Sequence, residues 1–274
     1  MRFALLQLNA GTEPAANACT IVQAIEHARA GGAAMLFTPE MSNMLDSDRA
    51  RSEARLKRED DDETLPAIRS AARRAGLWVH VGSLALRGDD GKRLNRGFVI
   101  DDQGEVRARY DKLHLFDVDL ATGESWRESA VYQRGDRAVA TDTPAGRLGL
   151  SICYDIRFPD LFRALTGAGA SILSIPAAFT VPTGEAHWHV LLRARAIEAG
   201  VFVVAAAQTG KHEDGRETFG HSLVVGPWGE VLLDMGSEPG LGFAELDLAQ
   251  VEAVRSRVPA LNHRRAIPPV EIAS

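Results

Sequence analysis

The sequence predicts an α/β domain in which helices cover one mixed β-sheet or two sheets. Strand-like and helix-like segments alternate along much of the chain, several of the strands are continuously apolar, and the turns DQG and PWG are typical of hairpins. Continuous apolar strands indicate a sheet that is covered on both faces. No linker, low-complexity block or fixed-period repeat interrupts the pattern, so we expect one domain over residues 1–274 with a C-terminal tail over residues 259–274.

The first third of the chain predicts three strands and two helices. The strands are expected over residues 2–9, 33–40 and 78–86, and the helices over residues 17–32 and 65–76. The first helix shows helical spacing of apolar residues and ends in two glycines, a common C-terminal stop. The second helix follows the acidic stretch REDDDETL, whose carboxylates favour a helix N-terminus.

The middle of the chain changes from alternation to hairpins. Residues 95–112 predict two strands around the turn DQG, whereas residues 113–136 have no clear period and are expected to form a loop. Residues 142–155 predict a turn and a strand that ends at Cys153. A helix is expected next, over residues 158–169.

The last third of the chain returns to alternating elements. In order, we expect a strand over 171–179, a helix over 185–200, a strand over 201–208, a hairpin over 221–235 around PWG, a strand over 242–248 and a helix over 248–258. Strands separated by helices favour parallel pairing, while hairpins give antiparallel pairs, so the sheet or sheets should be mixed.

The composition is that of an ordinary soluble globular protein, with 45% hydrophobic and 25% charged residues and a formal net charge of −6. This weakly acidic chain lacks the basic footprint of a nucleic-acid-binding protein. Its N-terminal residues lack the long apolar region of a signal peptide, and no segment is apolar enough to span a membrane. Cys19 and Cys153 are the only cysteines, so we expect free thiols and a cytoplasmic protein, with Cys19 packed on an amphipathic helix.

Cys153 is the first candidate for catalysis. It ends an apolar strand, and Pro159 a few residues later suits the first turn of a helix, so the sequence predicts a strand-to-helix turn. Ligands of α/β sheets gather at the carboxyl ends of strands, and a nearby helix N-terminus favours a thiolate. The alternative is that Cys153 is a small buried hydrophobe.

A nucleophilic thiol also needs a base and a group that stabilises an oxyanion. Glu40 ends the apolar run MLFTPE, where partial desolvation would raise its pKa and suit it to proton transfer near neutral pH, unless it only caps the next turn. Lys112 is one of four lysines and ends the second strand of its hairpin. Its ammonium would stabilise a negative carbonyl oxygen, although a lysine at a strand end is most often a solvated surface group.

Other catalytic and binding motifs are absent from the sequence. It has no G-x-S-x-G elbow, no HExxH, no paired CxxC and no G-x-G-x-x-G after a strand, which argues against a serine hydrolase and a dinucleotide site. His187 and His189 lie two apart on a predicted helix and therefore face different directions, which makes them a poor metal pair. No metal site is expected.

These segments together resemble the nitrilase superfamily, the carbon–nitrogen hydrolases. FTPE with Glu40, YDKLHLFDVD with Lys112 and GLSICYDIRFPDL with Cys153 are similar to the family's Glu-Lys-Cys signature in order and approximate spacing, and SWRES places Glu128 where many members have a second glutamate. The resemblance covers nearly the whole chain. It is greatest to the branch of deaminated glutathione amidases and ω-amidases, through segments such as LHLFDVDL and GHSLVVGPWGEV.

The resemblance implies a four-layer α-β-β-α sandwich, a homodimer or larger homo-oligomer, and no metal or organic cofactor. It also implies catalytic roles. Glu40 takes the proton of Cys153, the thiolate attacks an amide carbonyl, and Lys112 with the backbone N–H of Tyr154 holds the oxyanion. Glu40 then protonates the leaving group and activates the water that hydrolyses the thioester, while Glu128 positions the lysine or the substrate.

The resemblance further implies a carboxylate-bearing amide as substrate, with deaminated glutathione preferred and hydrolysis to acid and ammonia. Arg157 is the candidate for binding the carboxylate, unless it forms an ion pair with Asp155 or Asp160. Phe179 and Thr183 are implied to line the pocket. The alternatives are an ω-amidase acting on amides such as 2-oxoglutaramate, a hydrolase of N-carbamoyl compounds, aliphatic amides or nitriles, and a non-catalytic binding protein, which the occupied triad positions disfavour.

Overall fold

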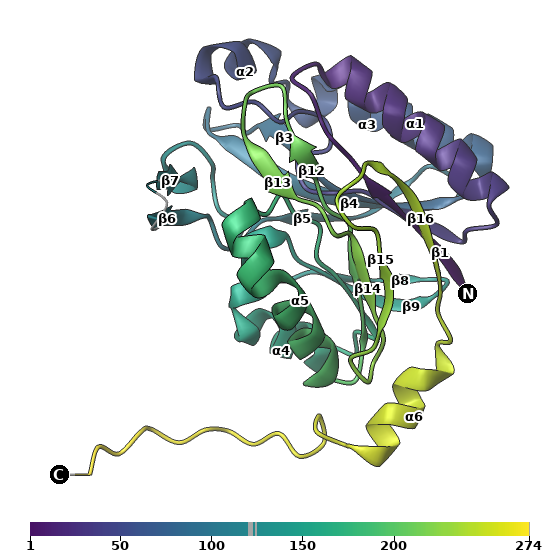
Figure 1. Ribbon diagram of the computed structural model, residues 1–274, viewed down its shortest axis with the longest axis vertical. Coiled ribbons are helices and arrows are strands. Elements are labelled where there is room, and N and C mark those ends of the chain that lie inside the picture. Colours follow the sequence, from purple (N-terminus) through teal and green to yellow (C-terminus); the bar gives the residue numbers. More distant parts are fainter. Residues whose placement is uncertain (120–122, 124, 274) are drawn as a thin grey trace.

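The computed structural model describes residues 1–119, 123 and 125–273, and it contains two six-stranded sheets (Figure 1). The first sheet has the order β16 (Gly240–Glu245), β1 (Arg2–Gln7), β2 (Met35–Phe37), β3 (Trp78–Arg87), β4 (Arg93–Ile100) and β5 (Val106–Asp111). The second has the order β15 (Val231–Asp234), β14 (Leu223–Val225), β11 (Phe202–Ala205), β10 (Ile172–Ser174), β9 (Gly146–Leu150) and β8 (Ala140–Thr143). Both sheets are mixed, because the three central strands β1–β2–β3 and β9–β10–β11 pair in parallel and the outer strands pair antiparallel.

Helices cover the outer face of each sheet. The described part of the chain has the helices α1 (Pro14–Ala30), α2 (Arg49–Arg55), α3 (Thr64–Ala75), α4 (Pro159–Gly167), α5 (Val181–Ile197) and α6 (Ala249–Arg257), of which α1, α3, α4 and α5 form the outer layers. α1 and α3 pack together on one side of the molecule, α4 and α5 lie on the opposite side, and α6 leads into an extended C-terminal segment (Figure 1). None of these described helices is both long and apolar enough to cross a membrane.

The layering follows from the alternation of side chains along β1. Phe3 and Leu5 point into the apolar core between the two sheets, whereas Ala4 and Leu6 point into a second core beneath α1 and α3. Successive side chains of a strand face opposite sides of the sheet, so a strand with apolar residues at every position is buried on both sides. The predicted four-layer α-β-β-α sandwich is therefore confirmed.

The strand that leads to Cys153 ends earlier than the sequence predicts. β9 ends at Leu150, and Cys153 begins a short 3-10 helix, Cys153–Arg157, with a backbone φ of 49°. The buried carboxylate of Asp155 accepts a hydrogen bond from the backbone N–H of Ile152 at 2.8 Å, which takes this amide away from the sheet and starts the helical turn.

The predicted loop over residues 113–136 is wrong in part. Its described residues include the paired strands β6 (Asp117–Asp119) and β7 (Ser125–Arg127) and the 3-10 helix Glu128–Ala130, while residues 120–122 and 124 lie outside the described residues. The sequence analysis also missed α2 and the hairpin of β12 (Thr209–Lys211) and β13 (Glu217–Phe219). These elements have three to seven residues, too few to show a period.

His80 on β3 is a titratable group buried between the sheets. Only 1% of it is exposed, its ring is tilted against Phe37 at 5.6 Å, and its Nδ1 lies 3.2 Å from Oγ of Ser174 on β10. Burial lowers the pKa of His80 from 6.5 to about 3, because a charged imidazolium would lose its hydration there.

We therefore predict that His80 makes the fold sensitive to acid. The unfolded chain takes up a proton near pH 6.5 and the folded chain does not, so stability is retained above pH 6.5 and lost as the pH falls below it. Between about pH 7 and pH 5, His80 should lower the free energy of unfolding by about 2 kcal/mol. Denaturant unfolding measures the free energy of unfolding at pH 7 and at pH 5. The difference between these two values should be smaller for His80→Asn than for the wild type. The same difference in both proteins would contradict the prediction.

Candidate active site

The structure brings four sequence-predicted residues, Glu40, Lys112, Glu128 and Cys153, to one cavity of about 370 Å³. Glu40 follows β2 and Lys112 follows β5, both in the first sheet, whereas Cys153 follows β9 in the second sheet. Glu128 comes from the short 3-10 helix after β7. The cavity therefore lies where the carboxyl ends of strands from both sheets meet.

Lys112 is buried between two carboxylates. Its Nζ donates to Glu40 Oε1 at 2.9 Å and to Glu128 Oε2 at 2.9 Å, and only 2% of Lys112 is exposed. Asn95 Nδ2 also donates to Glu40 Oε1 at 2.8 Å, and the backbone N–H of Ala178 donates to Glu40 Oε2 at 2.9 Å. The alternative interpretations, a turn-capping glutamate and a solvated lysine, are therefore wrong.

Contact between Lys112 and its two carboxylates keeps Lys112 and Glu40 ionised. Burial acts to raise the pKa of Glu40, but the Lys112 charge and the hydrogen bonds outweigh burial and lower this pKa below its usual value. Burial acts to lower the pKa of Lys112, yet the charges of Glu128 and Glu40 raise it well above its usual value. Desolvation acts in the expected direction, but the expected net rise of the Glu40 pKa is wrong, because the ammonium lies in direct contact with the carboxylate.

Cys153 is a protonated thiol in this environment. Burial, and after it the negative charge of Glu40, raises the pKa of Cys153 well above its usual value, against the opposing charge of Lys112. The helix N-terminus therefore does not produce the thiolate that the sequence analysis expected. Such a thiol becomes a nucleophile only when a neighbouring base accepts its proton. Cys19, by contrast, is exposed on α1, so the expectation that it packs there is wrong.

Asp155 fixes the backbone turn that carries Cys153. Its buried carboxylate accepts hydrogen bonds from Tyr110 Oη at 2.7 Å, from the backbone N–H of His114 at 3.0 Å and from that of Ile152 at 2.8 Å. The Nδ1 atom of His114 lies a further 2.7 Å from the same carboxylate. A positive φ is uncommon for a residue other than glycine, so these contacts hold Cys153 in a conformation that the chain alone would rarely adopt.

The cavity wall contains the other sequence-predicted residues. Tyr154, Phe179 and Thr183 all line it. The Tyr154 ring meets the Phe116 ring edge-on, with 5.1 Å between centroids, and Thr183 Oγ1 lies 2.8 Å from Thr180 Oγ1. Two aromatic side chains and one hydroxyl therefore belong to the cavity wall.

Arg157 also lines the cavity, and no carboxylate among the described residues forms an ion pair with it. Its guanidinium lies 5.7 Å from the centre of the Phe179 ring, and its Nη2 atom is 3.3 Å from His187 Nδ1. Asp155 and Asp160 are both described, and neither forms an ion pair with Arg157. The structural ion pair with Asp155 or Asp160 that the sequence analysis left open is therefore absent.

Sequence reasoning missed the groups that orient the predicted residues. Asn95 is fully buried and contacts Glu40, and the backbone amide of Ala178 holds the other oxygen of the same carboxylate. An asparagine in a strand was the one available signal, since asparagine is depleted in strands. No sequence pattern marks a single backbone N–H.

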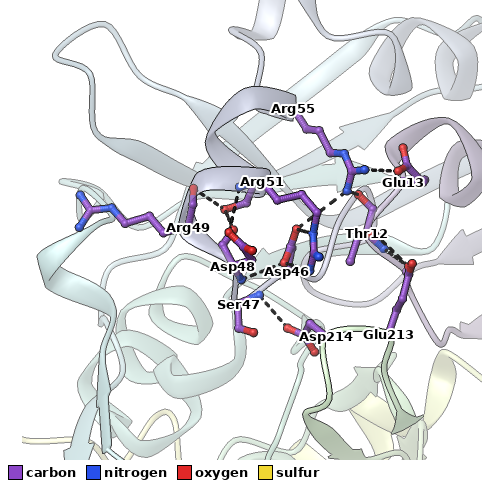
Figure 2. Close-up of polar contacts among 12 residues, drawn as sticks. Thr12, Glu13, Asp46, Ser47, Asp48, Arg49, Arg51, Arg55, Glu213 and Asp214 are labelled. Carbon is purple, nitrogen blue, oxygen red and sulfur yellow. Dashed lines mark hydrogen bonds and ion pairs between the residues drawn. The ribbon is translucent and has the colours of Figure 1, made fainter.

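The rim of the cavity is tied together by an ion-pair and hydrogen-bond network (Figure 2). Asp46 accepts hydrogen bonds from Nε and Nη2 of Arg51, both at 2.7 Å, and the backbone N–H of Ser47 donates to Asp214 Oδ2 at 2.8 Å. These contacts join the segment around α2 to the tip of the β12–β13 hairpin. The side chain of Arg49 points away from this network, and Arg49 is another residue of the cavity wall (Figure 2).

Comparison with known proteins adds independent information. A family model described as carbon-nitrogen hydrolase matches residues 2–256. A deaminated glutathione amidase from Yersinia enterocolitica is 40% identical over 270 residues, which cover 96% of this chain and 93% of that protein.

Two solved structures agree with this fold. The Caenorhabditis elegans NitFhit protein has a TM-score of 0.89 at 38% identity, and the match covers 96% of this chain but 65% of that longer chain. A variant of the amidase from Nesterenkonia sp. AN1 has a TM-score of 0.81 at 29% identity, and the match covers 97% of this chain and 94% of that one. That structure shows covalent addition of the acetamide moiety of fluoroacetamide at its active site cysteine.

We predict that Asp155→Asn destabilises the turn that carries Cys153. A neutral amide accepts fewer and weaker hydrogen bonds and brings its own donors, so at least one buried partner would lose its acceptor. The free energy of unfolding in urea should fall by about 1–3 kcal/mol. Asp160→Asn is the matched control, since Asp160 is exposed in the first turn of α4 and should change stability by less than about 1 kcal/mol. Equal losses in the two variants would contradict this assignment.

Proposed function

Since the chain belongs to the carbon–nitrogen hydrolase family and is an amidase, we propose that it hydrolyses a small carboxylate-bearing amide of the deaminated glutathione type through a thioester on Cys153. One observation carries the proposal: a buried thiol, a carboxylate and an ammonium meet at one cavity, with Lys112 held between Glu40 and Glu128. The covalent adduct at the active site cysteine of the Nesterenkonia amidase supports the same assignment.

In the proposed acylation step, Glu40 accepts the proton of Cys153 as the sulfur forms a bond with the amide carbonyl carbon. The carbonyl oxygen gains negative charge. An ammonium has three N–H donors, and Lys112 Nζ contacts Glu40 Oε1 at 2.9 Å and both Glu128 oxygens, at 2.9 Å and 3.2 Å. The longer contact to Glu128 Oε1 is the one that gives way, so that its donor turns to this oxygen. The backbone N–H of Tyr154 supplies a second donor. One such donor is worth about 10²–10³ in rate.

Collapse of this intermediate breaks the carbon–nitrogen bond, and the proton on Glu40 passes to the leaving nitrogen. Water then attacks the thioester while Glu40 accepts its proton, and the thiol is regenerated as the acid leaves. Glu128 acts by holding Lys112 in place. Ammonia is the expected product only when the substrate is a primary amide. In deaminated glutathione the amide nitrogen belongs to cysteine, so hydrolysis of that amide releases cysteinylglycine.

Arginines on the cavity wall support a substrate that carries carboxylates. Arg157 lies next to Phe179 and has no acidic partner within the part of the chain that the structure describes, and Arg49 and Arg216 also line the cavity. A planar guanidinium binds a carboxylate through two parallel hydrogen bonds. We propose that Arg157 binds one carboxylate of the substrate, and that Phe179 and Thr183 shape the cavity around its aliphatic part.

We also propose that the chain forms a homodimer or larger homo-oligomer in the cytoplasm. Val190 and Ile197 on α5 and Trp228 in the β14–β15 turn are exposed apolar side chains, and Arg193 Nε ties that turn to α5 through a 2.8 Å hydrogen bond to Gly229 O. Both cysteines are free, as in a reducing compartment. Light scattering should give the mass of at least two chains for the native protein and one chain for Ile197→Asp, whereas a native monomer would contradict this proposal.

Activity measurements test the catalytic proposal. Cys153→Ala should lose essentially all amide hydrolysis, because no other thiol faces Glu40, while Cys19→Ala should retain it. A comparison of kcat/KM should rank deaminated glutathione above 2-oxoglutaramate, an N-carbamoyl amino acid, an aliphatic amide and a nitrile. Full activity in Cys153→Ala would refute the nucleophile. Preference for another substrate would refute the specificity alone.

A further inference from the structure

Three side chains outside the catalytic cavity converge in a way that the sequence does not reveal. They are His189 on α5, His221 just before β14, and Asp234 at the end of β15. One ligand atom from each lies within 4.8 Å of the others. We infer that this cluster is a binding site for a divalent transition-metal ion such as Zn²⁺.

The carboxylate of Asp234 already lies between the two imidazole rings. Its Oδ2 atom is 2.9 Å from His189 Nε2, and its Oδ1 atom is 2.8 Å from His221 Nδ1. The ring centroids are 5.2 Å apart at an interplanar angle of 71°, so the two nitrogens approach from different directions. A carboxylate accepts hydrogen bonds, so in the metal-free cluster the two nitrogens that face Asp234 carry the protons. When a metal binds, each of these nitrogens gives up its proton, which moves to the other nitrogen of its ring or to solvent, and its lone pair becomes the ligand.

The backbone around the cluster is fixed by hydrogen bonds. His221 has a φ of 54°, its N–H donates to Gly236 O at 2.7 Å, and its carbonyl accepts from Trp188 Nε1 at 2.8 Å. The N–H of Gly236 donates to Asp234 Oδ1 at 3.0 Å. Phe219 stacks on His221 with 4.4 Å between ring centroids. A metal would therefore meet ligands whose positions are largely set before it binds.

The donor set selects the class of metal. Two imidazole nitrogens and one carboxylate oxygen suit Zn²⁺ and its first-row neighbours, whereas Ca²⁺ and Mg²⁺ prefer oxygen ligands. The three side chains are 28–36% exposed, so a hydrated ion can reach them and a water can complete a tetrahedral site.

The site differs from the histidine pair that the sequence analysis rejected. His187 points to Arg157 at the catalytic cavity, while His189 meets residues of the β14–β15 hairpin, so the two do not act together. A metal on His189, His221 and Asp234 would join α5 to the β14–β15 hairpin. Binding to the folded chain alone would raise its thermal stability.

Calorimetric titration of the metal-stripped full chain with Zn²⁺ tests the inference. Wild type should bind the ion at a site that His221→Ala and Asp234→Asn each weaken by at least about tenfold, since each removes one ligand. His187→Ala is the matched control on the same helix and should keep the wild-type affinity. In addition, Zn²⁺ should raise the Tm of wild type and not that of His189→Ala.

The two free cysteines are competing ligands, and Co²⁺ separates them from the cluster. Nitrogen and oxygen ligation gives d–d bands without thiolate charge-transfer absorption, so such a spectrum, lost in His221→Ala, supports the inference. The inference would be overturned if wild type, His221→Ala and Asp234→Asn bound Zn²⁺ with the same affinity. It would also be overturned by a Co²⁺ spectrum that shows thiolate ligation and persists in both variants. In either case the three side chains would form only a hydrogen-bonded surface cluster.

Discussion

The site depends on one buried interaction, the contact of the Lys112 ammonium with the carboxylates of Glu40 and Glu128. Burying these charges singly would cost several kcal/mol each, and removal of one partner would leave another uncompensated. Hydrogen bonds from Asn95 and from the Ala178 amide complete the shell around Glu40. Because these groups come from both sheets and from the loop between β7 and β8, the network can form only when the whole sandwich is assembled.

The same network determines the resting state of Cys153. With Glu40 ionised beside it, the thiol keeps its proton, and the pKa directions of the two groups place the proton on sulfur and the negative charge on the carboxylate. In the proposed mechanism, proton transfer coincides with attack on a bound carbonyl, and Lys112 stabilises the new oxyanion. A thiol of this kind is protected from oxidation and alkylation until a substrate enters, because the thiolate is the reactive form.

Local patterns predicted one or two mixed sheets with helices outside, and strand ends marked Glu40, Lys112 and Cys153 as candidates. The four-layer arrangement and the place of Glu128 followed only from the resemblance to the nitrilase superfamily. The lowered pKa of Glu40 could not be predicted, because it depends on a contact with Lys112, which follows another strand. The early end of β9 depends in the same way on the Asp155 carboxylate, and the His189 cluster joins residues from three separate elements. Sequence patterns report the burial of a position well and its partners poorly.

Intact-mass spectrometry of the native chain during turnover tests the central claim, that this network makes Cys153 an acyl-carrying nucleophile. After rapid acid quenching with a carboxylate-bearing amide present, the account predicts a mass increase equal to the acyl group, located by digestion on the peptide that contains Cys153. Turnover in which the label is found on Cys19, or in which hydrolysis proceeds without any adduct at Cys153 under conditions that preserve thioesters, would contradict it.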